Sequence, residues 1–235
     1  MSNSPFIRIH NLKKHFEMGG TTVRALDGVD IDIPAGSFTV VMGPSGSGKS
    51  TLLYLLGGLD RPSEGEIEVN GQRLDAMDEN QLALFRRKTV GFIFQSFNLI
   101  QSMTAQQNVA FPMQFAGVPV KQRDSRSLEL LERVGLADRS QHKPNELSGG
   151  QQQRVAIARS LVNEPALILA DEPTGNLDTT SGGSVMQVLS ELHQAGRTVL
   201  VVTHDPRMTH FASHKIFLLD GQIVSEAEYR SASLE

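Results

Sequence analysis

The chain has 235 residues, which is enough for one domain with room for a subdomain. Hydrophobic residues make up 39% and charged residues 20%, proportions typical of a globular protein with a buried core. The formal net charge of −4 argues against a nucleic-acid partner held through its phosphates. The absence of cysteine excludes disulfides and cysteine-based metal sites.

The sequence also argues against a membrane span. Residues 1–5 lack the basic start and apolar stretch of a signal peptide. A membrane-spanning helix needs roughly 20 apolar residues in a row. The longest apolar runs here, 166–170 and 199–202, are far shorter and are more typical of buried strands. We therefore expect a chain that does not itself cross a membrane.

The N-terminal part begins with strand patterns. Residues 6–10 and 29–33 alternate apolar and polar side chains, as half-buried strands do. Residues 37–42 form a short apolar run, which predicts a buried strand. A glycine-rich loop over 43–48 follows, and leucines at helical spacing then predict a helix over 49–56.

The remainder of the chain changes character twice. Strand signals become sparse over 96–162, where helical patterns dominate, and strands alternate with helices again after that. This alternation predicts a largely parallel sheet with helices on both faces, into which the helical middle is inserted. The expected strands are 67–69, 90–94, 166–170, 198–203 and 215–219, and the clearest expected helices are 81–87, 125–134, 151–161 and 181–193.

The glycine-rich loop matches the pattern G-x-x-x-x-G-K-[ST] in full and lies between a predicted strand and a predicted helix. Glycines let backbone N–H groups converge on phosphate oxygens, and the N-terminus of the following helix favours the same anion. Lys49 would reach the β- and γ-phosphates and Ser50 would bind Mg²⁺. An ordinary glycine-rich turn is the alternative. The predicted nucleotide-binding residues are Gly43, Pro44, Ser45, Gly46, Ser47, Gly48, Lys49 and Ser50.

Two carboxylates follow the apolar run 166–170. Ligands of such sheets bind beyond the carboxyl ends of the strands, which places Asp171 to hold Mg²⁺ and Glu172 to act as general base on the attacking water. The alternative is a pair of surface carboxylates that open a turn at Pro173. The phosphate loop upstream favours the catalytic interpretation, because phosphoryl transfer needs a metal ligand and a water-orienting group.

A second glycine motif opens the predicted helix near residue 150. Ser148 can cap this helix, and the glycines that follow expose backbone N–H groups to an anion. One nucleotide rarely needs two such cradles from one domain, so we expect two copies to pair head to tail, each closing the other's site. A capped helix without a ligand is the alternative. The motif residues are Ser148, Gly149, Gly150 and Gln151.

In order and spacing, the phosphate loop, the sequence Ala-Asp-Glu at 170–172 and the sequence Leu-Ser-Gly-Gly-Gln at 147–151 resemble the ABC (ATP-binding cassette) ATPase family over nearly the whole chain. The resemblance implies a single α/β domain with a P-loop NTPase (RecA-like) core and a mostly parallel sheet. It further implies an antiparallel β subdomain near the N-terminus and a helical subdomain carrying the signature motif. We expect the nucleotide-binding core over 1–95 and 163–235 and the helical subdomain over 96–162.

The family pattern assigns further roles. Thr51 would join the ATP-binding residues. Gln95 resembles the Q-loop glutamine, which touches Mg²⁺ or water and senses the permease, and His204 resembles the switch histidine at the γ-phosphate. Asp178 resembles the D-loop aspartate of the dimer interface, although it could equally cap a helix. Phe16 lies where the family has an adenine-stacking aromatic, and a core phenylalanine is the alternative.

The segments 57–60, 142–150 and 170–178 resemble the lipoprotein-release and macrolide-efflux branch. This resemblance implies a peripheral subunit on the inner, cytoplasmic face of the cell membrane. It would dimerise around two ATP and drive a separate permease with few spans and a large extracytoplasmic domain. Gln107 departs from the glutamate common in that branch, near the expected permease contact. The apolar side chains around 97–115 have two interpretations of equal weight. They form either a groove that receives a permease helix or the core of the helical subdomain.

Three other classes of protein are alternatives to a transporter subunit. A soluble ABC ATPase of DNA repair or translation usually carries coiled-coil insertions or a second cassette, and this chain has neither. A subunit of a division-type membrane signalling complex shares every motif above and stays an alternative. A kinase outside the family would leave residues 147–151 unexplained. The transported substrate would contact the permease, so the sequence does not identify it.

Overall fold

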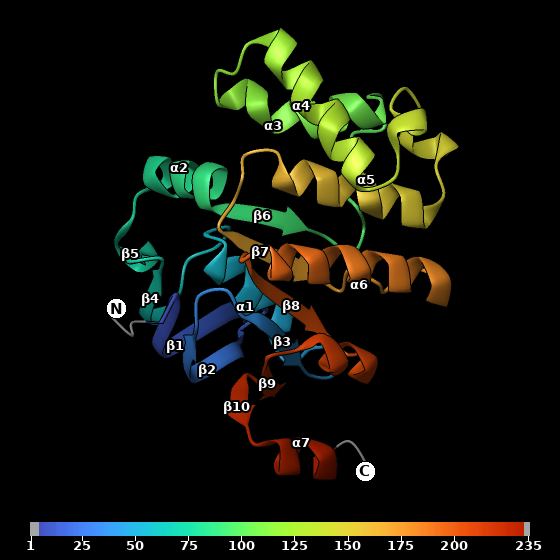
Figure 1. Ribbon diagram of the computed structural model, residues 1–235. Coiled ribbons are helices and arrows are strands. Elements are labelled where there is room, and N and C mark those ends of the chain that lie inside the picture. Colours follow the sequence, from blue (N-terminus) through green and yellow to red (C-terminus); the bar gives the residue numbers. More distant parts are fainter. Residues whose placement is uncertain (1–4, 233–235) are drawn as a thin grey trace. The chain divides into compact units, whose positions relative to one another are not determined.

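A computed structural model of the chain describes residues 5–232 and divides into two compact units. Among the described residues, unit 1 consists of 5–84 and 198–232, and unit 2 of 85–197. Helix α2 (Glu79–Thr89) contains the first boundary between them. The predicted helical subdomain, 96–162, lies wholly within unit 2 (Figure 1).

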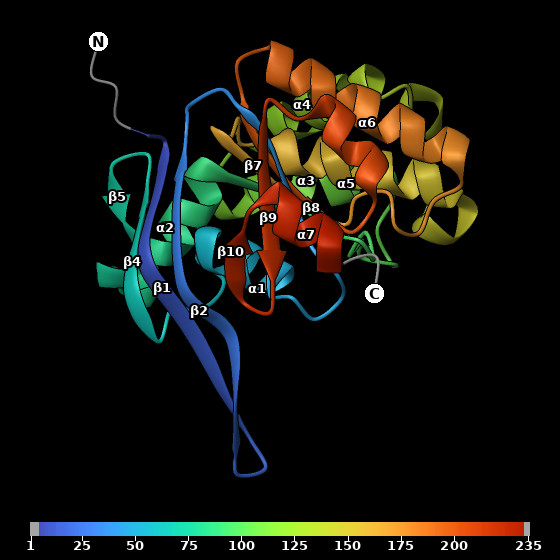
Figure 2. The same cartoon turned by 90° about the horizontal axis from the view of Figure 1, so that it is seen from below.

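Unit 1 contains an antiparallel sheet in the order β2-β1-β4-β5. It is built from β1 (Ile7–Met18), β2 (Thr21–Ile33), β4 (Glu64–Val69) and β5 (Gln72–Arg73). Buried isoleucines and valines alternate along the strands and give the sheet one apolar face. The β1–β2 hairpin extends beyond its neighbours to a turn at Gly19 and Gly20 (Figure 2). This sheet confirms the predicted antiparallel β subdomain.

The second layer of strands in unit 1 is mainly parallel. Strand β3 (Phe38–Met42) pairs in parallel with both β8 (Thr198–Thr203) and β9 (His214–Leu219), and β10 (Gln222–Val224) is antiparallel to β9. Every residue of β3 and β8 is buried, as expected of strands covered on both faces. The remaining helical elements are α1 (Lys49–Leu56), α7 (Glu226–Ala232) and the short turns Leu74–Ala76 and Pro206–Phe211.

Unit 2 is mainly helical. Its two strands, β6 (Val90–Ile93) and β7 (Leu167–Asp171), are parallel. Helix α5 (Gly149–Leu161) contacts β6 and three other helices, which are α3 (Ala105–Phe115), α4 (Val120–Arg133) and α6 (Thr179–Gln194). Residues 155–158 of α5 are fully buried, so this helix forms the centre of the unit's core. Short turns at Ala137–Arg139 and Pro144–Glu146 precede it.

The start of α3 depends on a buried asparagine. Asn108 is fully buried, its Oδ1 accepts from Ile100 N at 2.7 Å, and its Nδ2 donates to the carbonyls of Ile100, Met103 and Thr104. Thr104 caps the helix and Gln107 completes a capping box with it. The glutamine that departs from the branch pattern therefore retains the capping function of a glutamate.

We expect Asn108→Ala to lower the free energy of unfolding by about 3 kcal/mol, because several buried backbone groups of 100–104 lose their partner. Urea unfolding followed by circular dichroism measures the change. The exposed Asn145, in a short helical turn of the same unit, provides the control Asn145→Ala. Equal unfolding midpoints for the two variants would contradict the structural role given to Asn108.

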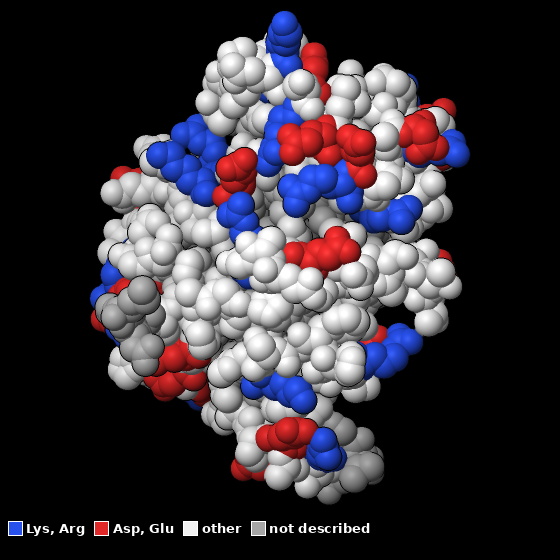
Figure 3. Space-filling model, viewed as in Figure 1, with Lys and Arg blue, Asp and Glu red and all other residues white. Residues whose placement is uncertain are grey.

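Charge is mixed on the face shown in Figure 3, where cationic and acidic side chains lie next to one another. In unit 2, Arg126 pairs with both Glu129 and Glu164. A single-sign patch of the kind that holds nucleic-acid phosphates is not seen on this face. Over residues 5–232, every helix is too short or too polar to span a bilayer.

Candidate nucleotide site

The phosphate loop connects β3 to α1 in unit 1. Its glycines are required by geometry as well as by motif. Gly48 adopts φ 100°, and a Cβ atom there would lie 2.2 Å from the carbonyl oxygen of Ala25. A Cβ at Gly43 would lie 2.4 Å from Leu218 O and from Ser47 Oγ. A larger residue at either position would collide with neighbouring protein atoms, so only glycine lets the loop follow this path.

Gly48 also occupies the N-cap position of α1 and makes no side-chain capping bond. Because glycine has no side chain, the N-cap residue does not itself cap the first N–H groups of α1. This is expected at a helix N-terminus that binds an anion. The Oγ atom of Ser47 is buried and has no hydrogen-bond partner among the described residues. A buried hydroxyl without a partner is costly, and a phosphate oxygen would satisfy it.

Lys49 is the positive charge of the loop. Its side chain is 7% exposed, and its Nζ donates to the carbonyl oxygen of Pro44 at 2.8 Å. The side chain of Lys49 thus folds back over the loop, where phosphates would bind. A buried ammonium needs negatively polarised partners, which the loop carbonyl supplies in part.

The acidic pair lies in unit 2, at the end of β7. Asp171 is the last residue of the strand and is 7% exposed, whereas Glu172 is half-buried. Glu172 has φ 43°, a left-handed conformation that is uncommon for residues other than glycine. Gly175 N donates to Glu172 O at 3.0 Å and closes the turn. Backbone strain of this kind is frequent at functional sites, and here it falls on the predicted general base.

The signature helix α5 begins as predicted. The exposed Ser148 caps it, with Gln151 N donating to Ser148 Oγ at 3.3 Å and Ser148 N donating to Gln151 Oε1 at 2.9 Å. Gly150 packs against α6, because a Cβ atom there would lie 2.7 Å from Ser181 Oγ. The two glycines therefore bring the helix N-terminus close to residues 176–181 within unit 2.

Comparison with known proteins decides the family. The family model described as ABC transporter matches residues 26–175. This chain belongs to the ABC transporter family. It is 50% identical over 210 residues to an uncharacterized ABC transporter ATP-binding protein of Thermotoga maritima, covering 89% of this chain and 90% of that protein. The predicted ABC resemblance and fold class are confirmed.

Two further relatives define the branch and the fold. A macrolide export ATP-binding/permease protein MacB of Hyphomonas neptunium is 46% identical over 231 residues, and the match covers 98% of this chain but 36% of MacB. The structure of the cassette MJ0796, a dimer in a post-hydrolysis state bound to ADP and Pi, superposes with a TM-score of 0.87 at 44% identity. It covers 93% of this chain and 97% of MJ0796. The chain is thus an ABC ATPase cassette similar to the macrolide-efflux branch.

The remaining predicted site residues fall into both units of the cassette. In unit 1, Phe16 is 39% exposed and is therefore not a core residue, and Lys14 Nζ lies 5.0 Å from its ring centroid. Lys14 is itself held by Asp60 Oδ1 at 2.7 Å and Arg61 O at 2.8 Å. The exposed His204 follows β8. The roles of Phe16 and His204 stay predictions.

In unit 2 the Q-loop and D-loop residues meet. Asn176 Nδ2 donates to Gln95 O at 3.0 Å, and Gln95 Nε2 lies 3.5 Å from Asn176 Oδ1. A Cβ atom at Gly175 would lie 2.8 Å from Gln95 Nε2. Gly175 and Asn176 belong to the segment 170–178, which resembles the branch. The sequence gives no sign that Asn176 contacts Gln95, because these residues lie 81 positions apart in the chain.

Asp178 caps helix α6. Its Oδ1 accepts from Ser181 N at 2.9 Å and its Oδ2 accepts from Ser181 Oγ at 2.7 Å. The backbone N–H of Ser181 is the main reason that the pKa of Asp178 lies below its ordinary value, so the cap is ionised at neutral pH. The capping interpretation is confirmed, and the interface role stays a prediction.

Sequence reasoning missed an arginine that shapes the Q-loop. Arg159 of α5 donates to Asn98 O at 2.5 Å and Phe97 O at 2.8 Å, and burial lowers its pKa. Phe97 and Asn98 both have positive φ. The apolar cluster beside them is mixed, since Met113 is 3% exposed and Phe115 65% exposed. Part of the cluster is therefore core, while Phe115 is accessible.

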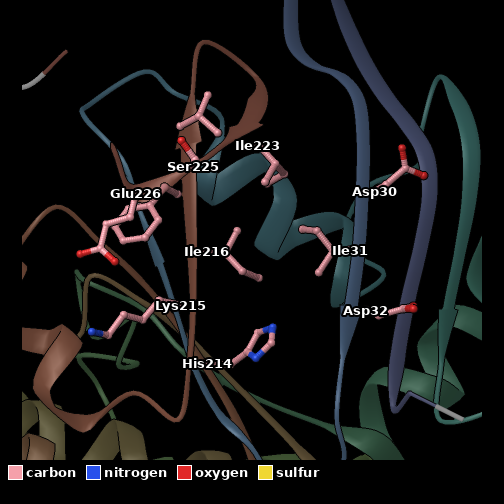
Figure 4. A pocket seen from close by; sticks show the side chains of 11 residues that line it. Asp30, Ile31, Asp32, His214, Lys215, Ile216, Ile223, Ser225 and Glu226 are labelled. Carbon is pink, nitrogen blue, oxygen red and sulfur yellow. The ribbon is translucent and has the colours of Figure 1, made fainter. Parts of the chain in front are cut away.

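A separate hollow of about 460 Å³ in unit 1 contains none of the predicted site residues. It lies between β2 and the β9–β10 pair, where Ile31, Ile216 and Ile223 face a common space (Figure 4). Its lining sets His214 and Lys215 against Asp30, Asp32 and Glu226, so it has no excess of positive charge for a triphosphate. The predicted nucleotide contacts come instead from loops and helix N-termini.

Proposed function

We propose that this cassette binds and hydrolyses ATP as one half of a homodimer and that the cycle drives a membrane permease. The observation that carries the proposal is the phosphate loop, where Ser47 Oγ is buried without a partner among the described residues and the path of the backbone at Gly43 and Gly48 excludes any Cβ. Lys49, folded over that loop, would neutralise the β- and γ-phosphates, and Thr51 would lie with them near the start of α1. Phe16 would stack on the adenine.

The residues suggested for Mg²⁺ fit that ion chemically. Ser50, Gln95 and Asp171 offer a hydroxyl, an amide oxygen and a carboxylate, and Mg²⁺ is usually bound by one or two carboxylates together with substrate phosphates. The Gln95 amide nitrogen is directed to Asn176 Oδ1, which leaves its oxygen for a metal. When bound, the ion would neutralise charge on the phosphates.

The protein's own groups would then carry out hydrolysis. Glu172, which lies at the strained turn after β7, would accept a proton from the attacking water. His204 would contact the γ-phosphate from the end of β8. Ser148 and the N–H groups that follow it would bind the γ-phosphate of the ATP held by a second copy. Asp178 would lie at that dimer interface.

The dimer and the permease are supported by the relatives. MJ0796 is described as a dimer bound to ADP and Pi, and MacB is described as an ATP-binding/permease protein for macrolide export. ATP would hold two copies together, and the difference in affinity between the open and closed states would perform work on the permease. We propose a permease on a separate chain with few spans and a large extracytoplasmic domain. The cassette would then lie on the inner face of the membrane, powering export or extracytoplasmic work.

The test is affinity purification of the tagged chain from native membranes after crosslinking, followed by mass spectrometry. We expect recovery of a few-span permease, enriched when ATP is added and reduced for Lys49→Ala. Recovery of ribosomal or DNA-repair proteins alone would retain the ATPase and overturn the transport function. A division-type membrane protein among the partners would favour the signalling alternative.

A further inference from the structure

Helix α5 contains a buried glutamine that none of the motifs explains. Gln153, five residues after Ser148, is fully buried. Its Nε2 donates to the carbonyl oxygen of Pro173 at 2.8 Å, and its Oε1 is buried with no hydrogen-bond partner among residues 5–232. The amide has only this orientation, because the reverse one would place two acceptor oxygens against each other.

The bond acts on the turn that carries the predicted general base. Pro173 directly follows Glu172, whose φ of 43° is sparsely populated. A residue before proline is also disfavoured in helical conformations, so this backbone persists only if its surroundings fix it. Gly175 N holds Glu172 O and Gln153 Nε2 holds Pro173 O, so consecutive carbonyls of the strained turn are both bound.

Stability alone would not place a glutamine here. A buried amide with an unsatisfied oxygen is penalised, whereas an apolar side chain of similar volume avoids the penalty. The neighbours of Gln153 in α5 include Val155, Ala156 and Ile157, all fully buried. The hydrogen bond to Pro173 is therefore the property that distinguishes glutamine from methionine at this position.

We propose that Gln153 is a positioning residue for ATP hydrolysis, holding the Glu172 turn through Pro173. This inference rests on the proposed ATPase function. The same helix begins at Ser148, which would contact the ATP of the second copy. Gln153 therefore connects this helix to the turn of Glu172, the residue that would activate water for hydrolysis of the protein's own ATP. A shift of α5 would therefore move the Glu172 turn, because a packed helix moves as a rigid element.

The experiment compares Gln153→Met with Gln187→Met. Gln187 is an exposed residue of α6, and its Nε2 donates to Glu191 Oε1 at 3.0 Å. We expect Gln153→Met to lower kcat by about 10- to 100-fold, since misplacing a catalytic group by an ångström has effects of that order. KM and ATP affinity should stay within about two-fold of the unaltered protein, because transition-state contacts alone are affected. Gln187→Met should leave kcat unchanged.

A second background separates positioning from a general structural role. If Gln153 acts through Glu172, Gln153→Met should lower the residual rate of a Glu172→Gln protein by less than about two-fold, because effects of groups acting as a unit are not additive. Gln153→Leu, which is also apolar and lacks the amide donor, should reproduce the loss in kcat if the methionine variant folds poorly.

The proposal is overturned if kcat of Gln153→Met equals that of the unaltered protein, or if the loss is equally large in the Glu172→Gln background. A parallel fall in ATP affinity would also overturn it, since it would indicate distortion of the nucleotide site. Failure of the proposed function is visible separately. In that case the unaltered protein and Glu172→Gln would release phosphate at the same rate.

Discussion

Glu172→Gln is expected to lower ATP hydrolysis by about 10²- to 10⁴-fold, the usual contribution of a general base. The amide keeps the shape of the side chain but does not accept a proton from water. The proposed ATP-binding residues 43–51 are unchanged, so ATP binding should be retained and an ATP-bound dimer should accumulate. Phosphate release measures the rate, and gel filtration with ATP and Mg²⁺ measures the dimer.

The matched control is Glu132→Gln, the same change at an exposed carboxylate of α4. It should retain full turnover and behave as the unaltered protein on the column. A Glu172→Gln protein that binds ATP yet elutes only as a monomer would contradict the proposed cycle. Unchanged turnover would remove Glu172 from the catalytic role.

Lys49→Ala is expected to weaken ATP binding by about one to two orders of magnitude, because hydrogen bonds to charged groups contribute about 1.5–3 kcal/mol. Lys49 is the positively charged residue of the phosphate loop, and its buried ammonium group donates to Pro44 O. Titration calorimetry with ATP measures the change directly. Lys121→Ala, at an exposed position of α4, should bind ATP normally. Retained affinity in Lys49→Ala would disprove the role assigned to this lysine.

The predictions of local structure succeeded where the signal is contained in a short window. The predicted helix 49–56 and strand 198–203 agree with α1 and β8 at both ends. Leucines at helical spacing and a short run rich in β-branched residues specify these elements without reference to the rest of the chain. The phosphate loop was found for the same reason, since its glycines and lysine are adjacent in sequence.

The prediction fell short where burial does not follow a simple period. Strand β2 extends from Thr21, although the pattern predicted only 29–33, because its first four residues are exposed on both faces. The helix α3 was not singled out, since it contains Pro112 and its start depends on Asn108 and the Thr104 cap. The start of β2 is stabilised by pairing with β1, and the start of α3 by its capping residues. The hydrophobic pattern predicts neither segment.

The sequence by itself determined the family, the type of fold and the identity of the phosphate loop, the acidic pair and the signature helix. The phosphate loop, the acidic pair and the start of the signature helix are contiguous motifs, and the chemistry of each requires particular residues at fixed spacing. Together these motifs identify the family and its fold. The tertiary structure alone decided which side chains reach which backbone carbonyls, such as Asn176 with Gln95 O and Gln153 with Pro173 O. Those contacts join residues far apart in the chain, and only packing of the folded backbone brings a donor to its acceptor.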